Sequence, residues 1–280
     1  MRPRPRAEMA PLLPIEARKT GHFPGRTLGE AKGNTMPPSQ LPTIDAQRRF
    51  WDWHWQHAEE RRVVNGWTLR RGETILRLLE SLRLDRPRIL DLGCGHGWFS
   101  AELARLGEVT GIDLSDEAVA RARAQYPGIT FIAGDLYDLP LPLGDVDVVV
   151  SQEVVAHVHD PEGYVRRAAQ ALRPGGYLVL ATANRFVMER LGDLGWSRQP
   201  PEHIAQHLDR RGLRQLLRPY FRVLRLTSII PLGERGILRV INSHKLNIVL
   251  GWLIPRRYLE ALKEWAGLGY ELIVLAQRRG

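Results

Sequence analysis

Three carboxylates and a run of glycines are the residues of this sequence whose types and spacing suit ligand chemistry. Asp91 lies near the end of a short apolar run, and glycines follow it at positions 93, 95 and 97. Asp113 comes 22 residues after Asp91, and Asp135 follows a third apolar run. A glycine turn before a helix exposes backbone N–H groups, and a carboxylate about 20 residues further on can hold a ribose. The pattern indicates a site for a ligand that contains a ribose.

Alternating strand and helix patterns must position these residues. Apolar runs bounded by turn residues predict strands, and apolar residues at helical spacing predict the helices between them. This alternation predicts an α/β fold with a parallel, doubly wound sheet and helices on both faces. The expected strands are 89–92, 108–112, 129–133, 145–151, 177–183, 221–230 and 270–277, and the expected helices include 98–106, 115–126 and 208–217.

The order Asp-x-Gly-x-Gly-x-Gly at 91–97 resembles the first motif of the class I S-adenosylmethionine-dependent methyltransferases. A dinucleotide fingerprint would instead need a third glycine where Trp98 stands. The resemblance covers residues 65–230 and is supported by the acidic residues after the second and third strands. It implies a Rossmann-like sheet of seven strands, mostly parallel with an antiparallel last strand, and S-adenosyl-L-methionine as cofactor.

The resemblance also implies roles for single residues. Asp91 would orient the methionyl end of the cofactor, Asp113 would hold both ribose hydroxyls, and Asp135 would meet the adenine amino group. The glycine turn would let the cofactor lie along the backbone. The remaining expected cofactor contacts are Gly93, Cys94, Gly95, Gly97, Leu114, Leu136 and Gln152.

In this family the stretch after the fourth strand faces the methyl group. Here it resembles the Glu-Val-Leu-Glu-His-Val element of the quinone-ring O-methyltransferases, with Glu153 and His157 at matching positions. His157 is the candidate general base, because imidazole titrates near neutrality. A structural histidine bonded to a backbone carbonyl is the alternative. The second glutamate of the element, which can bind a metal ion in that subgroup, is Ala156 here, so we expect no metal site.

Residues 45–84 are expected to form two helices, and the first is rich in tryptophan and histidine. Asp45 is expected to cap that first helix. In the family, such helices often close over the cofactor and shape the acceptor pocket. Trp51 and Trp55, together with His203 beyond the fifth strand, are therefore candidate substrate contacts. Packing of the tryptophans against the sheet is the alternative.

These expectations divide the chain into five segments. Residues 1–40, rich in proline and arginine, are expected to be a disordered tail, 41–84 a helical lid, and 85–230 the cofactor-binding core. A helical insertion is expected at 231–267, where a strongly apolar stretch at 246–254 is flanked by basic residues, and the last core strand and C-terminus occupy 268–280. The insertion is expected either to pack on the core or to touch a membrane or a lipophilic substrate.

The composition of the chain limits the cellular compartments and the binding partners that we expect. The chain of 280 residues has one cysteine, so we expect no disulfide and a reducing, cytoplasmic compartment. No apolar run reaches the ~18 residues that a membrane span needs, and the N-terminus lacks the apolar centre of a secretory signal. Basic charge lies at the ends: residues 201–280 hold 14 basic and 6 acidic side chains.

We therefore expect a methyltransferase for a small, hydrophobic or aromatic acceptor, with O-methylation favoured over transfer to nitrogen or carbon. A methyltransferase acting on tRNA or other RNA is one alternative, suggested by the basic C-terminal end. The stretch after the fourth strand lacks Asn/Asp-Pro-Pro-Tyr/Phe, so we expect no nucleic-acid partner. A non-catalytic protein that binds the cofactor is a second alternative, and Trp98 disfavours a third, a nucleotide-dependent oxidoreductase.

Overall fold

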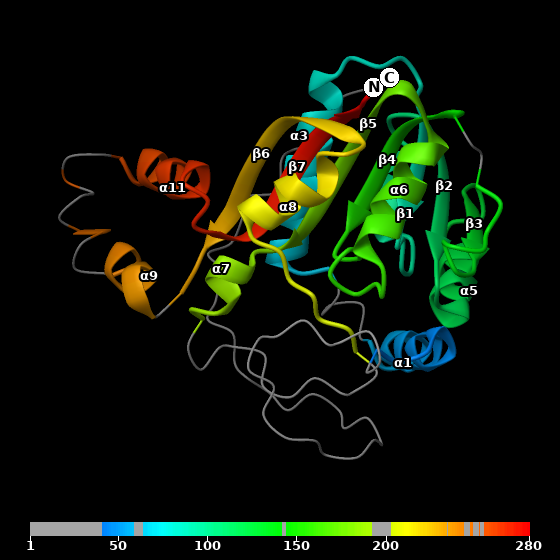
Figure 1. The fold of residues 1–280 in the computed structure, drawn as a ribbon, viewed down its shortest axis with the longest axis horizontal. Coiled ribbons are helices and arrows are strands. Elements are labelled where there is room, and N and C mark those ends of the chain that lie inside the picture. The colour runs from blue at the N-terminus through cyan, green and yellow to red at the C-terminus, as the bar shows by residue number, and fades with distance from the viewer. Residues whose placement is uncertain are drawn as a thin grey trace, which may run out of the picture.

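A seven-stranded mixed sheet forms the centre of the molecule (Figure 1). The computed structural model describes residues 41–58, 64–141, 144–191, 203–233, 235–243, 247–248, 252 and 255–280. The predicted tail at 1–40 lies outside these residues.

The strand order is β3-β2-β1-β4-β5-β7-β6. Strand β7 runs antiparallel to both β5 and β6, and the pairs among β1 to β5 are parallel. This confirms the predicted doubly wound sheet with a reversed last strand. The strands are β1 (Arg88–Leu92), β2 (Glu108–Asp113), β3 (Thr130–Ala133), β4 (Val146–Gln152), β5 (Leu172–Ala183), β6 (Phe221–Pro231) and β7 (Gly269–Arg278).

Helices cover both faces of this sheet. In Figure 1, α6 and α8 lie on the face toward the viewer and α3 lies behind the sheet, while α1 lies beyond one edge of the strands. The helices are α1 (Ile44–His57), α3 (Gly66–Ser81), α4 (Trp98–Leu103), α5 (Asp116–Gln125), α6 (Pro161–Ala171), α7 (Arg185–Met188), α8 (Arg210–Leu217), α9 (Gly236–Ile241) and α11 (Arg256–Trp265).

Strand β4 supplies side chains to the cores on both faces, because successive strand residues point to opposite sides of a sheet. Val149 packs in one cluster with Tyr164 of α6 and Leu213 of α8. Val148 packs in the other with Ile75 of α3. All five side chains are buried. The run of valines that predicted a buried strand is thus explained by two covered faces.

Side-chain caps fix where two helices near the site begin. The hydroxyl of Ser115 accepts a hydrogen bond from the N–H of Ala118 at 3.1 Å, as the sequence predicted for α5. The prediction that Asp45 caps α1 was wrong. The cap is Thr43, whose Oγ1 accepts from the N–H of Ala46 at 3.3 Å. Asp45 lies in the first turn instead, where its charge favours the positive end of the helix.

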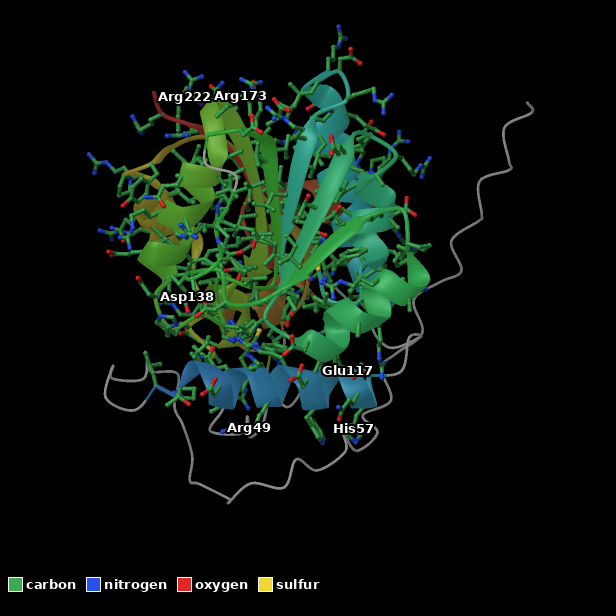
Figure 2. The ribbon with its side chains drawn as sticks, turned by 90° about the vertical axis from the view of Figure 1, so that its right-hand side faces the viewer. Arg49, His57, Glu117, Asp138, Arg173 and Arg222 are labelled. Atoms are coloured by element: carbon green, nitrogen blue, oxygen red, sulfur yellow. The ribbon has the colours of Figure 1, made fainter. Side chains whose placement is uncertain are left out.

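The parallel strands end at one edge of the sheet, where ligands bind in folds of this kind. Helix α1 runs along this edge, beside the start of α5. In Figure 2, α1 passes below Glu117, while Arg173 and Arg222 lie at the opposite edge of the molecule. None of the described helices combines the length and apolar character that crossing a bilayer requires.

Candidate active site

The turn after β1 is built from glycines in the left-handed region. Gly93, Gly95 and Gly97 have φ values of +77°, +52° and +83°, which side chains with a Cβ rarely adopt. The N–H groups of Gly93 and Cys94 donate to the carbonyl of Ile112 at 2.7 and 3.0 Å. These bonds fasten the turn to β2, so its conformation is fixed before any ligand binds.

Several side chains approach this turn closely. A Cβ on Gly93 would lie 2.0 Å from a methyl carbon of Val154, and a Cβ on Gly95 would lie 2.5 Å from the indole of Trp55. The Trp55 ring also faces the imidazole of His96, with ring centroids 5.2 Å apart. Trp55 was predicted to contact the substrate, but the structure places it over the glycine turn, on the side expected for the cofactor.

The carboxylate of Asp113, at the end of β2, is oriented by the backbone. Its Oδ2 accepts a hydrogen bond from the N–H of Gly95 at 2.8 Å, and its Oδ1 accepts from the N–H of Ser115 at 3.0 Å. Burial raises the pKa of Asp113, and the N–H groups of Ser115, Gly95 and Leu114 oppose that rise. Carboxylate oxygens have lone pairs beyond these bonds, so Asp113 can still accept from two hydroxyls.

Asp91 lies deeper, beneath the glycine turn. It is 1% exposed, and its Oδ2 accepts a hydrogen bond from the hydroxyl of Ser100 at 2.6 Å. Burial raises the pKa of Asp91 to about 7; the Ser100 bond opposes this rise and the charge of Asp113 adds to it. Asp91 therefore joins β1 to α4, and near neutral pH it is present both with and without its proton.

The other expected cofactor residues surround the same edge. Asp135 accepts a hydrogen bond from the N–H of Tyr137 at 3.0 Å in the turn after β3. Leu136 is partly buried, and its carbonyl accepts from the guanidinium of Arg167 at 3.1 Å. Burial raises the pKa of the Cys94 thiol well above its usual value, so Cys94 is not a nucleophile at neutral pH. For Leu136 and Cys94, backbone groups remain the expected contacts with the cofactor.

Beyond β4, His157 lies among aromatic and imidazole rings. Its Nδ1 is 2.7 Å from the carbonyl oxygen of Ile204. Its ring centroid is 5.5 Å from that of Trp51 and 4.6 Å from that of His203. A carbonyl can only accept, so the proton sits on Nδ1 and Nε2 keeps a lone pair. Burial lowers the pKa of His157 to about 4 despite the Ile204 bond, and the ring is neutral at neutral pH.

His203 packs against the same rings as His157. The fold thus brings together three residues that the sequence predicted for the site, Trp51, His157 and His203. The ring centroid of His203 is 5.2 Å from that of Phe50 and 5.8 Å from that of Trp51. Burial, followed by the nearby His157, lowers the pKa of His203 to about 2. In the part of the chain that the structure describes, Nδ1 of His203 has no hydrogen-bond partner. Such a buried nitrogen is a natural contact for a polar group of a ligand.

Glu153 belongs to a second buried polar cluster. Nη1 of Arg71, on α3, lies 2.8 Å from an oxygen of Glu271 and 3.7 Å from one of Glu153. Nε of Arg71 donates to the side-chain oxygen of Gln152 at 3.0 Å. Burial and the charge of Glu271 raise the pKa of Glu153, and Arg71 opposes them. Glu153 also has a φ of +55°, a costly conformation for a residue that is not glycine.

Arg71 and Glu271 are the members of this cluster that the sequence analysis missed. Glu271 interrupts the apolar strand 269–278, and that interruption was a signal available in the sequence. Arg71 gave no comparable signal, because arginine is common on partly exposed helix positions. The carboxylates of Glu153 and Glu271 share the single guanidinium of Arg71. At this edge of the sheet the cluster therefore either has a net negative charge or holds a proton on one carboxylate.

Among the residues that the structure describes, metal ligands are not assembled around His157. Over the described residues, no three or more His, Cys, Asp and Glu side chains are arranged to hold a metal ion. The position of the second glutamate of the family element is occupied by Ala156, which is buried. That this protein needs no metal stays a prediction.

Comparison with known proteins shows which proteins this chain is similar to. A model for a methyltransferase domain matches residues 90–180. A probable S-adenosylmethionine-dependent methyltransferase of Mycobacterium tuberculosis is 35% identical over 168 residues, which cover 59% of this chain and 57% of that protein. A ubiquinone biosynthesis O-methyltransferase of Xanthomonas oryzae is 41% identical over 113 residues, 38% of this chain and 47% of that protein. The chain spans about half the length of the curated relatives it matches.

A solved structure shows the same fold over most of the chain. The crystal structure of an S-adenosylmethionine-dependent methyltransferase from Mesorhizobium loti has a TM-score of 0.51 and 26% identity, and the match covers 72% of this chain and 96% of that one. The family implies S-adenosyl-L-methionine as the cofactor, and the rigid glycine turn beside the oriented carboxylate of Asp113 suits its adenosine. The fold, the glycine turn and these matches identify a class I S-adenosylmethionine-dependent methyltransferase domain in this chain.

Proposed function

We propose that this protein transfers a methyl group from S-adenosyl-L-methionine to an oxygen of a small, hydrophobic or aromatic acceptor. The observation that carries this proposal is the state of His157. Its imidazole is neutral, its Nδ1–H is committed to a backbone carbonyl, and its Nε2 lone pair remains beside Trp51 and His203. This combination suits a base next to an apolar acceptor.

The cofactor, when bound, supplies a methyl group that is already activated on a sulfonium. What the chain must add is position: the acceptor oxygen has to lie about 3 Å from the methyl carbon, in line with the bond that breaks. On our proposal, Asp113 holds the ribose hydroxyls, while Asp91 orients the methionyl end. Asp135 and the backbone of Leu136 contact the adenine. The glycine turn provides the surface on which the cofactor lies.

His157 orients the acceptor and removes its proton. A hydroxyl of the acceptor donates a hydrogen bond to Nε2. This hydrogen bond points a lone pair of the acceptor oxygen toward the methyl group. The hydroxyl becomes strongly acidic as its oxygen gains the methyl carbon, so an imidazole of lowered pKa still accepts the proton. The bond to Ile204 fixes the tautomer that this step needs.

Helix α1 forms one wall of the proposed acceptor pocket. It contributes Phe50, Trp51 and His54 to the rings around His157 and places Trp55 over the glycine turn. Flat, apolar rings suit an aromatic or hydrophobic acceptor better than a charged one. The similarity to a ubiquinone biosynthesis O-methyltransferase supports an oxygen acceptor and a role in small-molecule biosynthesis.

A screen of candidate acceptors tests the proposal. The purified chain is incubated with cofactor that carries a deuterated methyl group and with a panel of phenols, catechols, carboxylic acids, amines and bulk tRNA. Mass spectrometry then locates the label. Transfer to hydroxyl groups supports the proposal. Transfer only to amines, carbon or tRNA, or tight cofactor binding without transfer to any class, would replace it by one of the alternatives. We propose a cytoplasmic setting, because the single cysteine is buried and unpaired.

A further inference from the structure

Exposed apolar side chains gather in one region of the protein. Of the ten large hydrophobic residues that are exposed in the described part of the chain, seven lie between positions 237 and 265. Scattered exposed hydrophobics are ordinary, whereas a gathered set marks a contact surface. We call this set the apolar face; its members are Ile237, Val240, Ile248, Trp252, Tyr258, Leu262 and Trp265.

The apolar face lies on α9 and α11 and on the residues between them. Figure 1 shows both helices beyond β6, at the end of the molecule away from α1. The face is therefore separate from the candidate active site. Its two tryptophans are the most exposed of the seven, at 88% for Trp252 and 75% for Trp265. Leaving two indoles in water is costly, which points to a partner that covers them.

Helix α11 has two distinct sides. Leu259 and Lys263, four residues apart, are buried toward the protein. Tyr258, Leu262 and Trp265 follow at spacings of four and three, so they share a neighbouring side, which is exposed. An ordinary surface helix turns its apolar stripe toward the protein, whereas α11 also carries an apolar stripe that is exposed.

The exposure of that second stripe is not caused by a loosely held helix. Glu264 of α11 forms an ion pair with Arg70 of α3. The hydroxyl of Ser228 donates to the carbonyl of Glu264 at 2.6 Å, and Nη1 of Arg210 donates to the carbonyl of Trp265 at 3.0 Å. The core thus holds α11 from one side and turns Trp265 outward.

Basic side chains flank the apolar face. Arg239 of α9 and Arg257 of α11 are both exposed, and the guanidinium of Arg257 lies 4.8 Å from the ring centroid of Tyr258. The two glutamates of α11, Glu260 and Glu264, form ion pairs within the protein. Residues 231–267 carry six basic and three acidic side chains. The face therefore combines aromatic rings with positive charge.

We propose that the apolar face binds the surface of a lipid bilayer that contains anionic lipids. Tryptophan and tyrosine favour the boundary between headgroups and acyl chains, and arginines beside them are attracted to negative headgroups. A second copy of the chain fits less well, because a two-fold contact through this face would bring like charges together. The proposal does not depend on which acceptor is methylated.

Vesicle co-sedimentation of the full chain tests this proposal. The protein is mixed with vesicles of phosphatidylcholine alone, or with vesicles in which a third of the lipid is phosphatidylglycerol. We expect about tenfold stronger binding to the anionic vesicles, and this preference should fall as salt is added. The double variant Trp252→Ser/Trp265→Ser should lose about tenfold in binding to the anionic vesicles.

Two matched variants separate the apolar face from general surface effects. Ile132→Ser removes an exposed hydrophobic side chain on β3, at the other end of the sheet, and should bind as the wild type does. Arg239→Gln/Arg257→Gln should weaken anionic binding, whereas Arg105→Gln, at an arginine 76% exposed outside the face, should not. Circular dichroism verifies folding of each variant. Equal binding to both vesicle types, or an unaffected tryptophan variant, would overturn the proposal. So would a wild-type dimer that this variant converts to monomers.

Discussion

The hydroxyl of Ser115 donates a hydrogen bond to the carboxylate of Asp52 at 2.6 Å, although the two residues are 63 positions apart in the sequence. Asp52 lies on α1, and Ser115 is the cap of α5, two residues after Asp113. The same carboxylate oxygen accepts from the N–H of Glu117 at 3.2 Å. Helix α1 is thus attached to the strand end that we propose to hold the ribose, so its position and cofactor binding should be coupled.

Removal of this attachment should loosen α1. Asp52→Ala loses two hydrogen bonds, one of them charge-assisted with the Ser115 hydroxyl, which contribute about 2 kcal/mol to the docking of the helix. We expect faster cleavage near α1 in limited proteolysis and a severalfold rise in the KM for the cofactor. Gln56→Ala, at an exposed and uncharged side chain on the same helix, is the control and should leave both unchanged. Equal cleavage rates in the two variants would show that the Asp52 bonds do not hold α1.

Substitution of Asp113 should weaken cofactor binding. Asp113→Asn keeps the size of the side chain but loses the charge that two ribose hydroxyls would contact. Two hydrogen bonds to a charged group are worth about 3 kcal/mol, or about a hundredfold in Kd. Calorimetric titration with S-adenosylmethionine and with its demethylated product measures the change. Asp138→Asn, an exposed carboxylate near the same edge, should bind normally; wild-type affinity in Asp113→Asn would refute the ribose assignment.

His157 should affect turnover without affecting cofactor binding. His157→Gln can keep the hydrogen bond to the carbonyl of Ile204 but provides no base, so kcat should fall about a hundredfold or more. The Kd of the cofactor should stay at the wild-type value. His159→Gln, two residues further on and exposed, is the matched control. A turnover equal to that of the wild type would leave His157 as a structural residue only.

Much of the site was predictable because its signals are local. The glycine spacing after β1 and the carboxylates Asp91, Asp113 and Asp135 each follow from a few neighbouring residues. The doubly wound, mostly parallel sheet with a reversed last strand required only the alternation of strand and helix and the resemblance to a known family, whereas the strand order came from the structure. Local patterns report turns and strand ends well, and those are the features that make the cofactor side of the site.

Contacts that join distant segments of the chain were harder to predict. Arg71 and Glu271 are 200 positions apart and share a hydrogen bond that no local pattern announces. Trp55 was assigned to the substrate from its residue type, and only the fold places it over Gly95. The boundary of α1 was missed for a different reason: Thr43 and Asp45 are both good caps, and the choice depends on backbone geometry.

The buried carboxylates Glu153 and Glu271 beside Arg71 make stability depend on pH. Burial raises the pKa values of both Glu153 and Glu271, so the folded state keeps a proton that the unfolded chain has released. Stability is then full at low pH and is lost as the pH rises toward the raised values. Glu271→Gln removes one of the two charges and should be about 1 kcal/mol more stable than the wild type at pH 8, with a smaller difference at pH 6.

Denaturant unfolding at the two pH values measures this difference. Glu108→Gln, an exposed glutamate at the start of β2, is the control and should match the wild type at both. A loss of several kcal/mol in Glu271→Gln at both pH values would contradict the prediction. It would mean that the ion pair between Arg71 and ionised Glu271 stabilises the fold more than the repulsion between Glu153 and Glu271 destabilises it.

The histidines around His157 should make the protein sensitive to acid. Unfolded histidine binds a proton near pH 6.5, whereas burial holds His157 neutral down to about 4. Between these values the unfolded chain binds more protons, so the free energy of unfolding falls as the pH falls. The side chain of His157 is partly exposed to solvent, which weakens this effect. We therefore expect His157 to account for about 1 kcal/mol of the stability that is lost between pH 7 and pH 5.

His157→Gln isolates this contribution, because glutamine does not titrate and can keep the bond to Ile204. Unfolding of the wild type and the variant is compared at pH 7, 6 and 5, with His159→Gln as the control. The wild type should lose stability relative to His157→Gln as the pH falls, while His159→Gln should follow the wild type. Parallel curves for all three proteins would show that the imidazole of His157 exchanges protons with water at its ordinary pKa. The neutral imidazole on which the proposed proton transfer depends would then be the minority form below about pH 6.5.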